Sequence, residues 1–279
     1  MRRPLLGALG ATLDVALSQE CRTAALCREE RESVRKGLTI PYPLPLVRQQ
    51  GPHAVIRFEQ VSKRYESGHE ALSQLSFEVA AGQMAFVTGH SGAGKSTLLK
   101  LIALIERPSH GQIVVDGQSL AKVGRSGVPK LRRRLGMVFQ DHRLLMDRTV
   151  FANVELPLVI GGIAPAERSR RVRAALEKVG LLAYERQLPD SLSTGEQQRV
   201  GIARAIVARP AVLIADEPTG NLDPQLAVEI MGLFAEFQEI GTTVLIASHD
   251  LPLIKRMHKR VVVLDHGRLV ADIAAEEVL

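Results

Sequence analysis

Residues 89–97, Gly-His-Ser-Gly-Ala-Gly-Lys-Ser-Thr, have the composition and spacing of a loop that binds phosphate groups. Glycines allow consecutive backbone N–H groups to turn towards phosphate oxygens, and the start of a following helix adds partial positive charge. We expect the Lys95 ammonium to reach the β- and γ-phosphates and the Ser96 hydroxyl to coordinate Mg²⁺. A glycine-rich turn with a chance lysine is the simpler alternative. The loop alone does not distinguish an ATPase from a GTPase or a kinase.

Two adjacent carboxylates, Asp216 and Glu217, follow an apolar run at 212–215 that predicts a buried strand. We expect Asp216 to orient hydrated Mg²⁺ and Glu217 to polarise an attacking water molecule. A pair of helix-capping acids is the alternative interpretation. A kinase would need a site for an acceptor hydroxyl, so Glu217 beside Asp216 favours hydrolysis.

A third run, Leu-Ser-Thr-Gly-Glu-Gln-Gln-Arg at 192–199, precedes a helix predicted at 200–208. The backbone N–H groups of Ser193 and Gly195 would face an anion at the start of such a helix. An ordinary capped helix is the alternative, because Ser193 followed three residues later by Glu196 has the spacing of a capping box.

These three motifs, in this order, resemble the nucleotide-binding motifs of the ATP-binding cassette (ABC) family, whose signature reads Leu-Ser-Gly-Gly-[Gln/Glu]. The resemblance covers about residues 55–270. It implies an α/β fold: a P-loop ABC ATPase domain with a RecA-like parallel-sheet core, an antiparallel β subdomain and an inserted helical subdomain at about 141–198. It also implies ATP and Mg²⁺ as cofactors, and a homodimer in which each ATP lies between Lys95 of one copy and Ser193 of the other.

The resemblance implies roles for four further residues. Tyr65, 24 residues before Gly89, would lie beneath the adenine, although a plain core residue is the alternative. Gln140 would bind Mg²⁺ and sense the γ-phosphate, Asp223 would lie in a loop that crosses the dimer interface, and His249 would contact the γ-phosphate. The predicted site residues are Glu217, His249 and Gln140 for catalysis; Tyr65, Gly89, His90, Ser91, Gly92, Ala93, Gly94, Lys95, Ser96 and Thr97 for ATP; Ser193, Thr194, Gly195 and Glu196 for the ATP of the second copy; Asp223 at the interface; and Ser96, Gln140 and Asp216 for Mg²⁺.

Thr194 departs from the pattern, because the family has its first glycine of the signature at this position. A branched side chain on a backbone of positive φ would cost about 1–2 kcal/mol. Gly195 is retained, so its N–H donor remains. On this ground the sequence predicts that Thr194→Gly raises or preserves ATP turnover through tighter ATP-driven dimerisation.

The elements that must position these residues alternate between strand and helix patterns, which predicts a parallel sheet with a helical insertion. The apolar runs at 211–216 and 243–248 are typical of buried parallel strands. Strands are expected at 55–65, 75–79, 84–88, 112–116, 135–140, 211–216 and 243–248, and helices at 94–106, from about 149 to 198, at 200–208 and at 224–240.

The composition is that of an ordinary globular protein, with 279 residues, 46% hydrophobic and 24% charged. Aromatic residues make up only 4% and Trp is absent, which counts against base-stacking platforms for nucleic acid. Both cysteines, Cys21 and Cys27, lie in the first 30 residues, so the main body has no disulfide framework and fits a reducing compartment. The net charge of +6 permits contact with nucleic acid or anionic lipid without requiring it.

Residues 1–54 differ in composition from the chain that follows and end in the proline-rich segment 41–45. Residues 1–17 imitate a signal peptide only faintly, because Asp14 interrupts the apolar stretch. We therefore expect 1–54 to be a disordered extension or the product of a misassigned start codon, and the nucleotide-binding domain to occupy 55–279.

Residues 88–102, 139–150 and 215–223 are most similar to bacterial cell-division ATPases of the family. That resemblance implies a peripheral protein on the cytoplasmic face of the inner membrane at the division septum. There the homodimer would act with an FtsX-like integral membrane protein of the divisome to control cell-wall hydrolases, and no nucleic acid is expected.

Two alternatives remain open. The first is the ATPase subunit of a lipoprotein-releasing or drug-exporting ABC transporter, which shares the segment 215–223. The second is a soluble ABC ATPase acting on nucleic acid or ribosomes, for which the basic clusters at 130–134 and 255–260 are the only hint. Only 121 positions separate Lys95 from Asp216, too few for the long coiled-coil insertion of the DNA-repair forms, and the chain has one cassette where ribosome-acting forms carry two.

Overall fold

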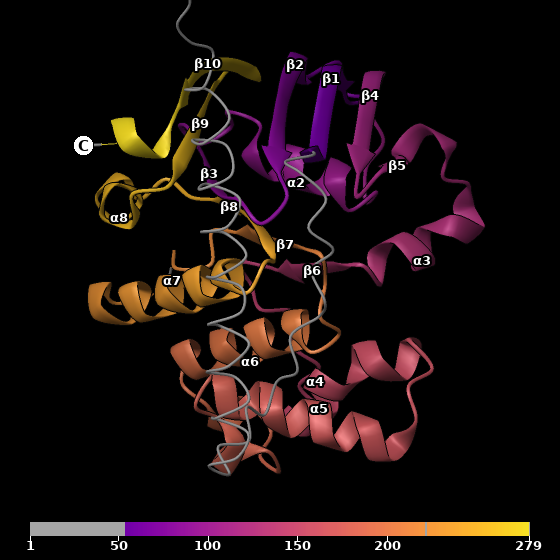
Figure 1. The fold of residues 1–279 in the computed structure, drawn as a ribbon, viewed down its shortest axis with the longest axis vertical. Helices are drawn as coiled ribbons and strands as arrows, with labels where there is room; N and C mark the ends of the chain where they lie inside the picture. Colours follow the sequence, from indigo (N-terminus) through magenta and orange to yellow (C-terminus); the bar gives the residue numbers. More distant parts are fainter. Residues whose placement is uncertain (1–53, 221, 279) are drawn as a thin grey trace, which may run out of the picture. The chain divides into compact units, whose positions relative to one another are not determined.

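The computed structural model of the protein describes residues 54–220 and 222–278, so the predictions made for residues 1–53 lie outside it. The described residues form two sheets with helices packed around them (Figure 1). The first sheet has the order β2-β1-β4-β5 and is antiparallel. Its strands are β1 (Ala54–Arg64), β2 (Glu70–Ala80), β4 (His110–Val115) and β5 (Gln118–Ser119).

The second sheet has six strands in the order β10-β9-β3-β8-β7-β6, of which all but β10 run parallel. Its strands are β3 (Met84–Thr88), β6 (Leu135–Val138), β7 (Val212–Asp216), β8 (Thr243–Ala247), β9 (Arg260–Asp265) and β10 (Arg268–Ile273). Carboxyl ends of parallel strands meet at one edge of a sheet, so the segments that follow β3, β7 and β8 emerge side by side.

Seven α-helices accompany the sheets in the described part of the chain. They are α2 (Lys95–Ile102), α3 (Val128–Arg132), α4 (Val150–Ile160), α5 (Pro165–Lys178), α6 (Thr194–Ile206), α7 (Pro224–Glu239) and α8 (Leu251–Met257), and 3₁₀ turns occupy Leu120–Lys122, Arg125–Gly127, Leu182–Tyr184, Pro189–Ser191 and Ala275–Glu277. None of the helices in 54–220 and 222–278 is both long and apolar enough to cross a membrane.

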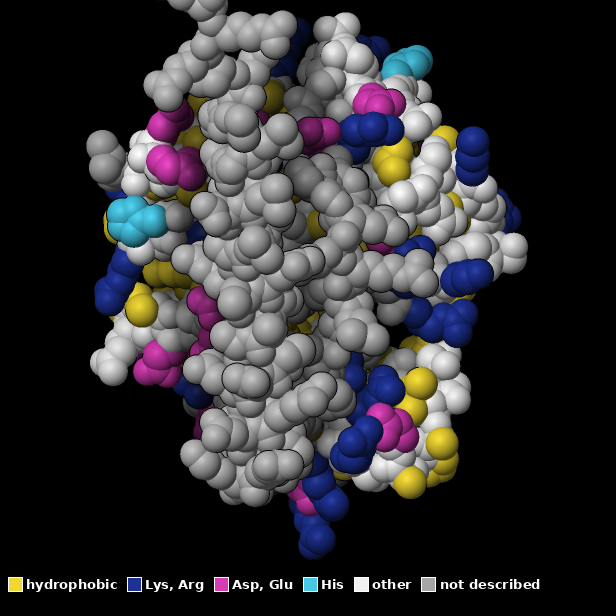
Figure 2. All heavy atoms as spheres, viewed as in Figure 1, with side chains coloured by type: hydrophobic (Ala, Val, Ile, Leu, Met, Phe, Trp, Pro, Cys, Tyr) yellow, Lys and Arg dark blue, Asp and Glu magenta, His cyan; other side chains and the backbone are white. Residues whose placement is uncertain are grey.

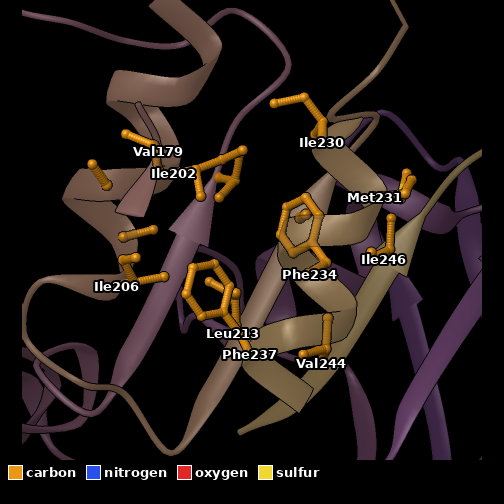
Figure 3. Close-up of a cluster of buried hydrophobic side chains, with 14 of the residues drawn as sticks. Val179, Ile202, Ile206, Leu213, Ile230, Met231, Phe234, Phe237, Val244 and Ile246 are labelled. Carbon is orange, nitrogen blue, oxygen red and sulfur yellow. The ribbon is translucent and has the colours of Figure 1, made fainter. Parts of the chain in front are cut away.

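Alternating side chains of the six-stranded sheet supply two hydrophobic cores. On β3, Ala85 and Val87 join the core that β1, β2 and α2 share, while Phe86 joins the core beneath α6 and α7. Figure 3 shows Phe234 and Phe237 of α7 within this second core, near Leu213 of β7. Both faces of the sheet are therefore buried, which explains why its strands are almost wholly apolar.

The expected α/β architecture, with a parallel core sheet, an antiparallel sheet and inserted helices, is confirmed, but several element boundaries were wrong. The stretch expected to be helical from 149 to 198 consists of α4, α5 and 3₁₀ turns, because Gly161 and Gly162 end α4. The signature helix begins at Thr194 and not at 200, because Ser193 caps it. Helix α2 ends at Ile102, and Leu104 then has φ 51.

Three elements of the C-terminal part were not predicted, namely α8, β9 and β10. The strand expected at 75–79 is also longer, since β2 begins at Glu70 and pairs with β1 along its length. Strand β9 pairs in parallel with β3 and carries β10 as an antiparallel edge. The missed strands therefore complete the sheet beside the phosphate-binding loop.

Candidate functional site

One cavity of about 640 Å³ collects side chains from segments that lie far apart in the sequence. It opens at the carboxyl ends of β3, β7 and β8 and at the start of α2. Its lining residues are Tyr65, His69, Ala71, His90, Ser91, Gly92, Gly94, Lys95, Ser96, Thr97, Gln140, Glu217 and His249. Most of the residues predicted from the motifs for nucleotide binding and catalysis thus lie around one space.

The phosphate loop joins β3 to α2, and close backbone contacts require two of its glycines, Gly89 and Gly94. Gly94 caps α2 with φ 104, and a Cβ there would lie 2.6 Å from the carbonyl oxygen of Ala71. A Cβ on Gly89 would lie 2.2 Å from the carbonyl oxygen of Leu264. Both approaches exclude any other residue, so the loop is fixed between β2 and the end of β9.

The Lys95 side chain is largely buried, and its ammonium points back into the loop. Nζ donates hydrogen bonds to the carbonyl oxygens of Gly89 at 2.8 Å and His90 at 3.2 Å, and lies 3.9 Å from Oε1 of Glu217. A buried ammonium held only by neutral carbonyls and one carboxylate is well placed to exchange these contacts for stronger ones with phosphate oxygens.

Asp216 ends β7 and lies opposite Ser96, whose hydroxyl donates a hydrogen bond of 3.1 Å to its Oδ1. Burial raises the pKa of Asp216, the Ser96 hydrogen bond lowers it, and the nearby Glu217 charge raises it. The Asp216 carboxylate and the Ser96 hydroxyl are hard oxygen ligands of the kind that Mg²⁺ prefers. A divalent cation between them would stabilise the ionised form of the carboxylate. The amide of Gln140 lines the same cavity, so the three residues expected to hold Mg²⁺ fit such an ion.

Glu217 has a left-handed backbone with φ 46 and a side chain that is only 11% exposed. Its backbone N–H donates to the carbonyl oxygen of Ala247 in β8, and its Oε2 lies 2.9 Å from Nδ1 of His249. A non-glycine residue in this conformation costs about 1–3 kcal/mol and persists where the surroundings fix it, often at functional sites. Glu217 and His249 are therefore held as a pair on the wall of the cavity.

Tyr65 follows β1 and is partly exposed on the cavity, which excludes the alternative of a plain core residue. Its hydroxyl lies 3.2 Å from Oγ1 of Thr97, so the ring is tied to the start of α2. Nζ of Lys63 lies 4.9 Å from the ring centroid. This arrangement leaves an aromatic ring at the rim of the cavity.

The signature residues lie at the start of α6 and do not line the cavity of their own chain. Ser193 and Glu196 form a capping box, in which the Ser193 backbone N–H donates to Oε2 of Glu196 at 2.8 Å. The Ser193 hydroxyl donates to the same oxygen at 2.7 Å, and these bonds lower the pKa of Glu196. The ordinary capped helix proposed as an alternative is therefore present, and the Ser193 N–H is engaged within its capping box.

The expectation of strain at Thr194 was wrong. Thr194 is the first residue of α6 and is not among the residues with positive φ, because Ser193 rather than Thr194 makes the turn into the helix. Gly195 also has no positive φ, but a Cβ there would lie 2.2 Å from Cδ2 of Leu226. Close packing against Leu226 of α7 thus explains why residue 195 is a glycine.

Asp223 caps α7, and its Oδ1 accepts hydrogen bonds from the backbone N–H groups of Gln225 at 3.1 Å and Leu226 at 3.0 Å. It does not line the cavity. The segment that precedes α7 is thereby fixed at the surface, and the expected role at a dimer interface stays a prediction.

The structure adds residues that motif reasoning missed. Nδ1 of His142 lies 2.5 Å from Oε1 of Gln198, and Arg204 donates to the carbonyl oxygens of His142 and Arg143, each at 2.6 Å. Gln198 and Arg204 belong to α6, whereas His142 follows Gln140 by two residues. No pattern in the sequence predicts these contacts, which connect the segment after Gln140 to α6.

Comparisons with known proteins agree with this geometry. The profile of the ABC transporter family matches residues 72–220. The chain is 55% identical over 222 residues to the cell division ATP-binding protein FtsE of Escherichia coli, covering 80% of this chain and all of that protein. It is 44% identical over 218 residues to FtsE of Bacillus subtilis, covering 78% and 96%.

Among solved structures, the dimeric ATP-binding cassette MJ0796, in a post-hydrolysis state bound to ADP and Pi, is similar with a TM-score of 0.73 and 31% identity. The match covers 79% of this chain and 98% of that chain. The chain therefore belongs to the ABC transporter family, within the group of bacterial cell-division ATP-binding proteins named FtsE.

Proposed function

We propose that this protein is the ATP-hydrolysing subunit of a bacterial cell-division complex and acts as a homodimer on an FtsX-like integral membrane protein. The observation that carries the proposal is the single cavity lined by the phosphate loop, Glu217, Gln140 and His249, with Asp216 hydrogen-bonded to the lining residue Ser96. High identity to FtsE proteins over their full length supports the assignment to cell division over the exporter and nucleic-acid alternatives. The complex would lie on the cytoplasmic face of the inner membrane at the septum.

The chain's own groups divide the reaction between them. The loop N–H groups and Lys95 bind the β- and γ-phosphates, and the Tyr65 ring stacks on the base. Glu217 is oriented by its backbone and by His249. Its carboxylate accepts a hydrogen bond from the attacking water and directs that water at the γ-phosphorus. A bound Mg²⁺, held by Ser96, Asp216 and Gln140, would neutralise phosphate charge.

The second copy completes the site, because the signature residues point away from the cavity of their own chain. The start of α6 would offer the backbone N–H of Gly195 to an anion on another molecule, and that of Ser193 once its bond to Glu196 is exchanged for one to the anion. ATP would thus be bound between the phosphate loop of one copy and α6 of the other, and hydrolysis would release the two. The similarity to a dimeric cassette supports this arrangement.

A groove of about 520 Å³ between β6 and helices α4, α5 and α6 is where we expect the membrane protein to insert a cytoplasmic helix. Met137 lines the groove three residues before Gln140, so a bound helix would lie close to the segment that senses the γ-phosphate. The groove is lined by the apolar side chains of Leu135, Met137, Leu156, Leu158, Ile160 and Ile163 and by Arg132, Arg133, Arg171 and Arg204. The described lining residues include no acid, so the partner helix should carry acidic side chains beside an apolar face.

The basic cluster at 130–134 is accounted for without nucleic acid. Figure 2 shows Lys and Arg side chains over the α3 region, at the right of the view. Arg132 donates to the carbonyl oxygens of Ala103 and Leu104, and Arg134 forms an ion pair with Asp116. Both arginines stabilise the local fold, and Arg132 also borders the groove.

Depletion of the gene, followed by complementation, tests the proposed function. Cells depleted of the protein should grow as filaments, and wild-type protein should restore division while Lys95→Ala should not. Normal division in depleted cells would refute the cell-division role and leave the ATPase assignment intact.

Co-purification tests the groove. Arg133→Glu should weaken recovery of the FtsX-like protein while the isolated protein still hydrolyses ATP, because Arg133 is exposed and lines the groove, not the cavity. Lys122→Glu, an exposed lysine outside the groove, is the matched control. Equal recovery with both variants would contradict the docking site.

A further inference from the structure

Two histidines and an aspartate meet beside the cavity, and of these only His90 lines it and is among the residues expected to bind ATP. His90 comes from the phosphate loop, Asp265 ends β9, and His266 lies in the turn between β9 and β10. One ligand atom from each lies within 4.8 Å of the others. We propose that these three side chains form a site for a divalent transition-metal ion of the zinc class, which connects the phosphate loop to the β9–β10 hairpin.

The hydrogen bonding of His90 is the first argument. Nδ1 lies 2.6 Å from the carbonyl oxygen of Ser91, and because a carbonyl only accepts, Nδ1 carries the hydrogen. In the neutral ring Nε2 then presents a lone pair, and it lies 3.0 Å from Oδ1 of Asp265. Two acceptors at this distance need a cation between or upon them, either a proton on Nε2 or a metal ion. A backbone carbonyl on the other ring nitrogen is also the usual second partner of a metal-binding histidine.

The distances suit a small ion with tetrahedral coordination. Zinc lies about 2.0–2.2 Å from nitrogen and carboxylate ligands, which separates two ligands of a tetrahedron by about 3.3 Å. His90 and Asp265 are already 3.0 Å apart, and Nε2 of His266 lies 3.8 Å from the same carboxylate oxygen. The His266 side chain is 82% exposed, so a small rotation closes the remaining gap without disturbing the core.

The backbone that carries the three ligands is fixed. Thr88, at the end of β3, pairs with Val263 of β9, so the loop and the hairpin leave the sheet side by side. The Gly267 N–H donates to the carbonyl oxygen of Ala93 at 3.1 Å, and Gly89 packs against the carbonyl of Leu264. The ligands therefore stand on a scaffold set by sheet and loop contacts, not by the chance meeting of mobile side chains.

The ligand types decide the class of metal. Two imidazoles with one carboxylate favour zinc and its neighbours over magnesium or calcium, which prefer oxygen ligands alone. All three side chains are about half exposed or more, so water can occupy the remaining position. This site is separate from the one expected for Mg²⁺, which uses Ser96 and Asp216.

Titration calorimetry of tag-free, nucleotide-free full chain with ZnCl₂ tests the proposal. His266→Ala and Asp265→Asn should each weaken zinc binding about 10-fold or more, a typical cost of disturbing a metal site. His266→Cys should retain binding, because thiolate is a good zinc ligand. His110→Ala, an exposed histidine outside the cluster, should bind zinc like the wild type.

The cysteines Cys21 and Cys27 are the competing ligands within the chain. A Cys21→Ser/Cys27→Ser double variant should retain the binding, and the Co²⁺-substituted protein should show visible ligand-field bands without a thiolate charge-transfer band. Loss of binding in the double variant, or equal affinity in the wild type, His266→Ala and Asp265→Asn, would overturn the proposal. Both outcomes are independent of ATP hydrolysis, so the proposed function and this site can fail separately.

Discussion

Replacement of Glu217 by Gln tests the proposed chemistry most directly. The substitution keeps the length of the side chain and one acceptor oxygen, so the contact with His249 and the buried position of the side chain, 11% exposed, survive. It removes the negative charge that would attract a proton from water. The expected loss in turnover is about 10²–10⁴-fold, the range for a lost general base, which corresponds to about 2.7–5.4 kcal/mol of activation free energy.

The binding of ATP should persist, because the phosphate contacts belong to the loop and Lys95. Removal of a charge 3.9 Å from the Lys95 ammonium frees that cation for the phosphates, so ATP affinity should be equal or higher. Unhydrolysed ATP should then hold two copies together, and gel filtration with ATP and Mg²⁺ should show a stable dimer.

The assay measures phosphate release beside the binding of a fluorescent ATP analogue. Glu66→Gln, an exposed acid in the turn after β1, is the matched control and should hydrolyse ATP like the wild type. If Glu217→Gln folds, binds ATP and hydrolyses it at the wild-type rate, Glu217 is not the group that activates water.

Lys95→Ala should weaken nucleotide binding about 10- to 100-fold, the cost of one or two charge-assisted hydrogen bonds, as measured with the fluorescent analogue. Burial raises the pKa of Asp216, so the folded state binds more protons than the unfolded state between the ordinary and the raised pKa, and stability falls as pH rises through that window. Asp216→Asn should therefore raise the melting temperature of the nucleotide-free protein at pH 7, and the gain should vanish in acid below the ordinary aspartate pKa. A chain that begins at Met-Val55 should fold and hydrolyse ATP like the full chain, and loss of solubility or activity would contradict the proposed domain boundary. Thr194→Gly should preserve turnover without a gain and weaken α6 by at most about 0.5 kcal/mol, because no strain is relieved; a clear rise in turnover would restore a steric role for Thr194.

The parts of the site that the sequence predicts are those whose chemistry is local. The phosphate loop needs glycines, a lysine and a hydroxyl within nine consecutive residues, so its pattern is visible without any tertiary information. Asp216 and Glu217 are recognisable because an apolar strand ends at them. The strain at Glu217 was not predictable, because its left-handed backbone depends on the contact with Ala247 of β8.

The parts that escaped prediction depend on pairings between distant segments. The apolar run at 261–264 followed by Gly267 is a strand-and-turn pattern, but it does not say which strands it joins. By contrast, the contact between His142 and Gln198 joins residues 56 positions apart, and neither residue type predicts such a contact. Gln198 is 1% exposed, and its Nε2 has no hydrogen-bond partner among the described residues, which no sequence pattern would suggest.

The order of strands explains why some residues of the site are predictable from the sequence and others are not. Parallel strands β3, β8 and β7 are neighbours, so residues that end them are brought to one edge by the sheet alone, and each motif needs to be correct only within itself. Gln140 reaches the same cavity through a segment that is also bound to α6, by the hydrogen bonds from Arg204 to the carbonyls of His142 and Arg143. A shift of Gln140 towards a γ-phosphate would therefore pull on α6, the helix that we propose to present Ser193 to the second copy. The contacts that the sequence does not reveal are thus the ones that connect the Gln140 segment to α6, and so the two halves of the proposed ATP site.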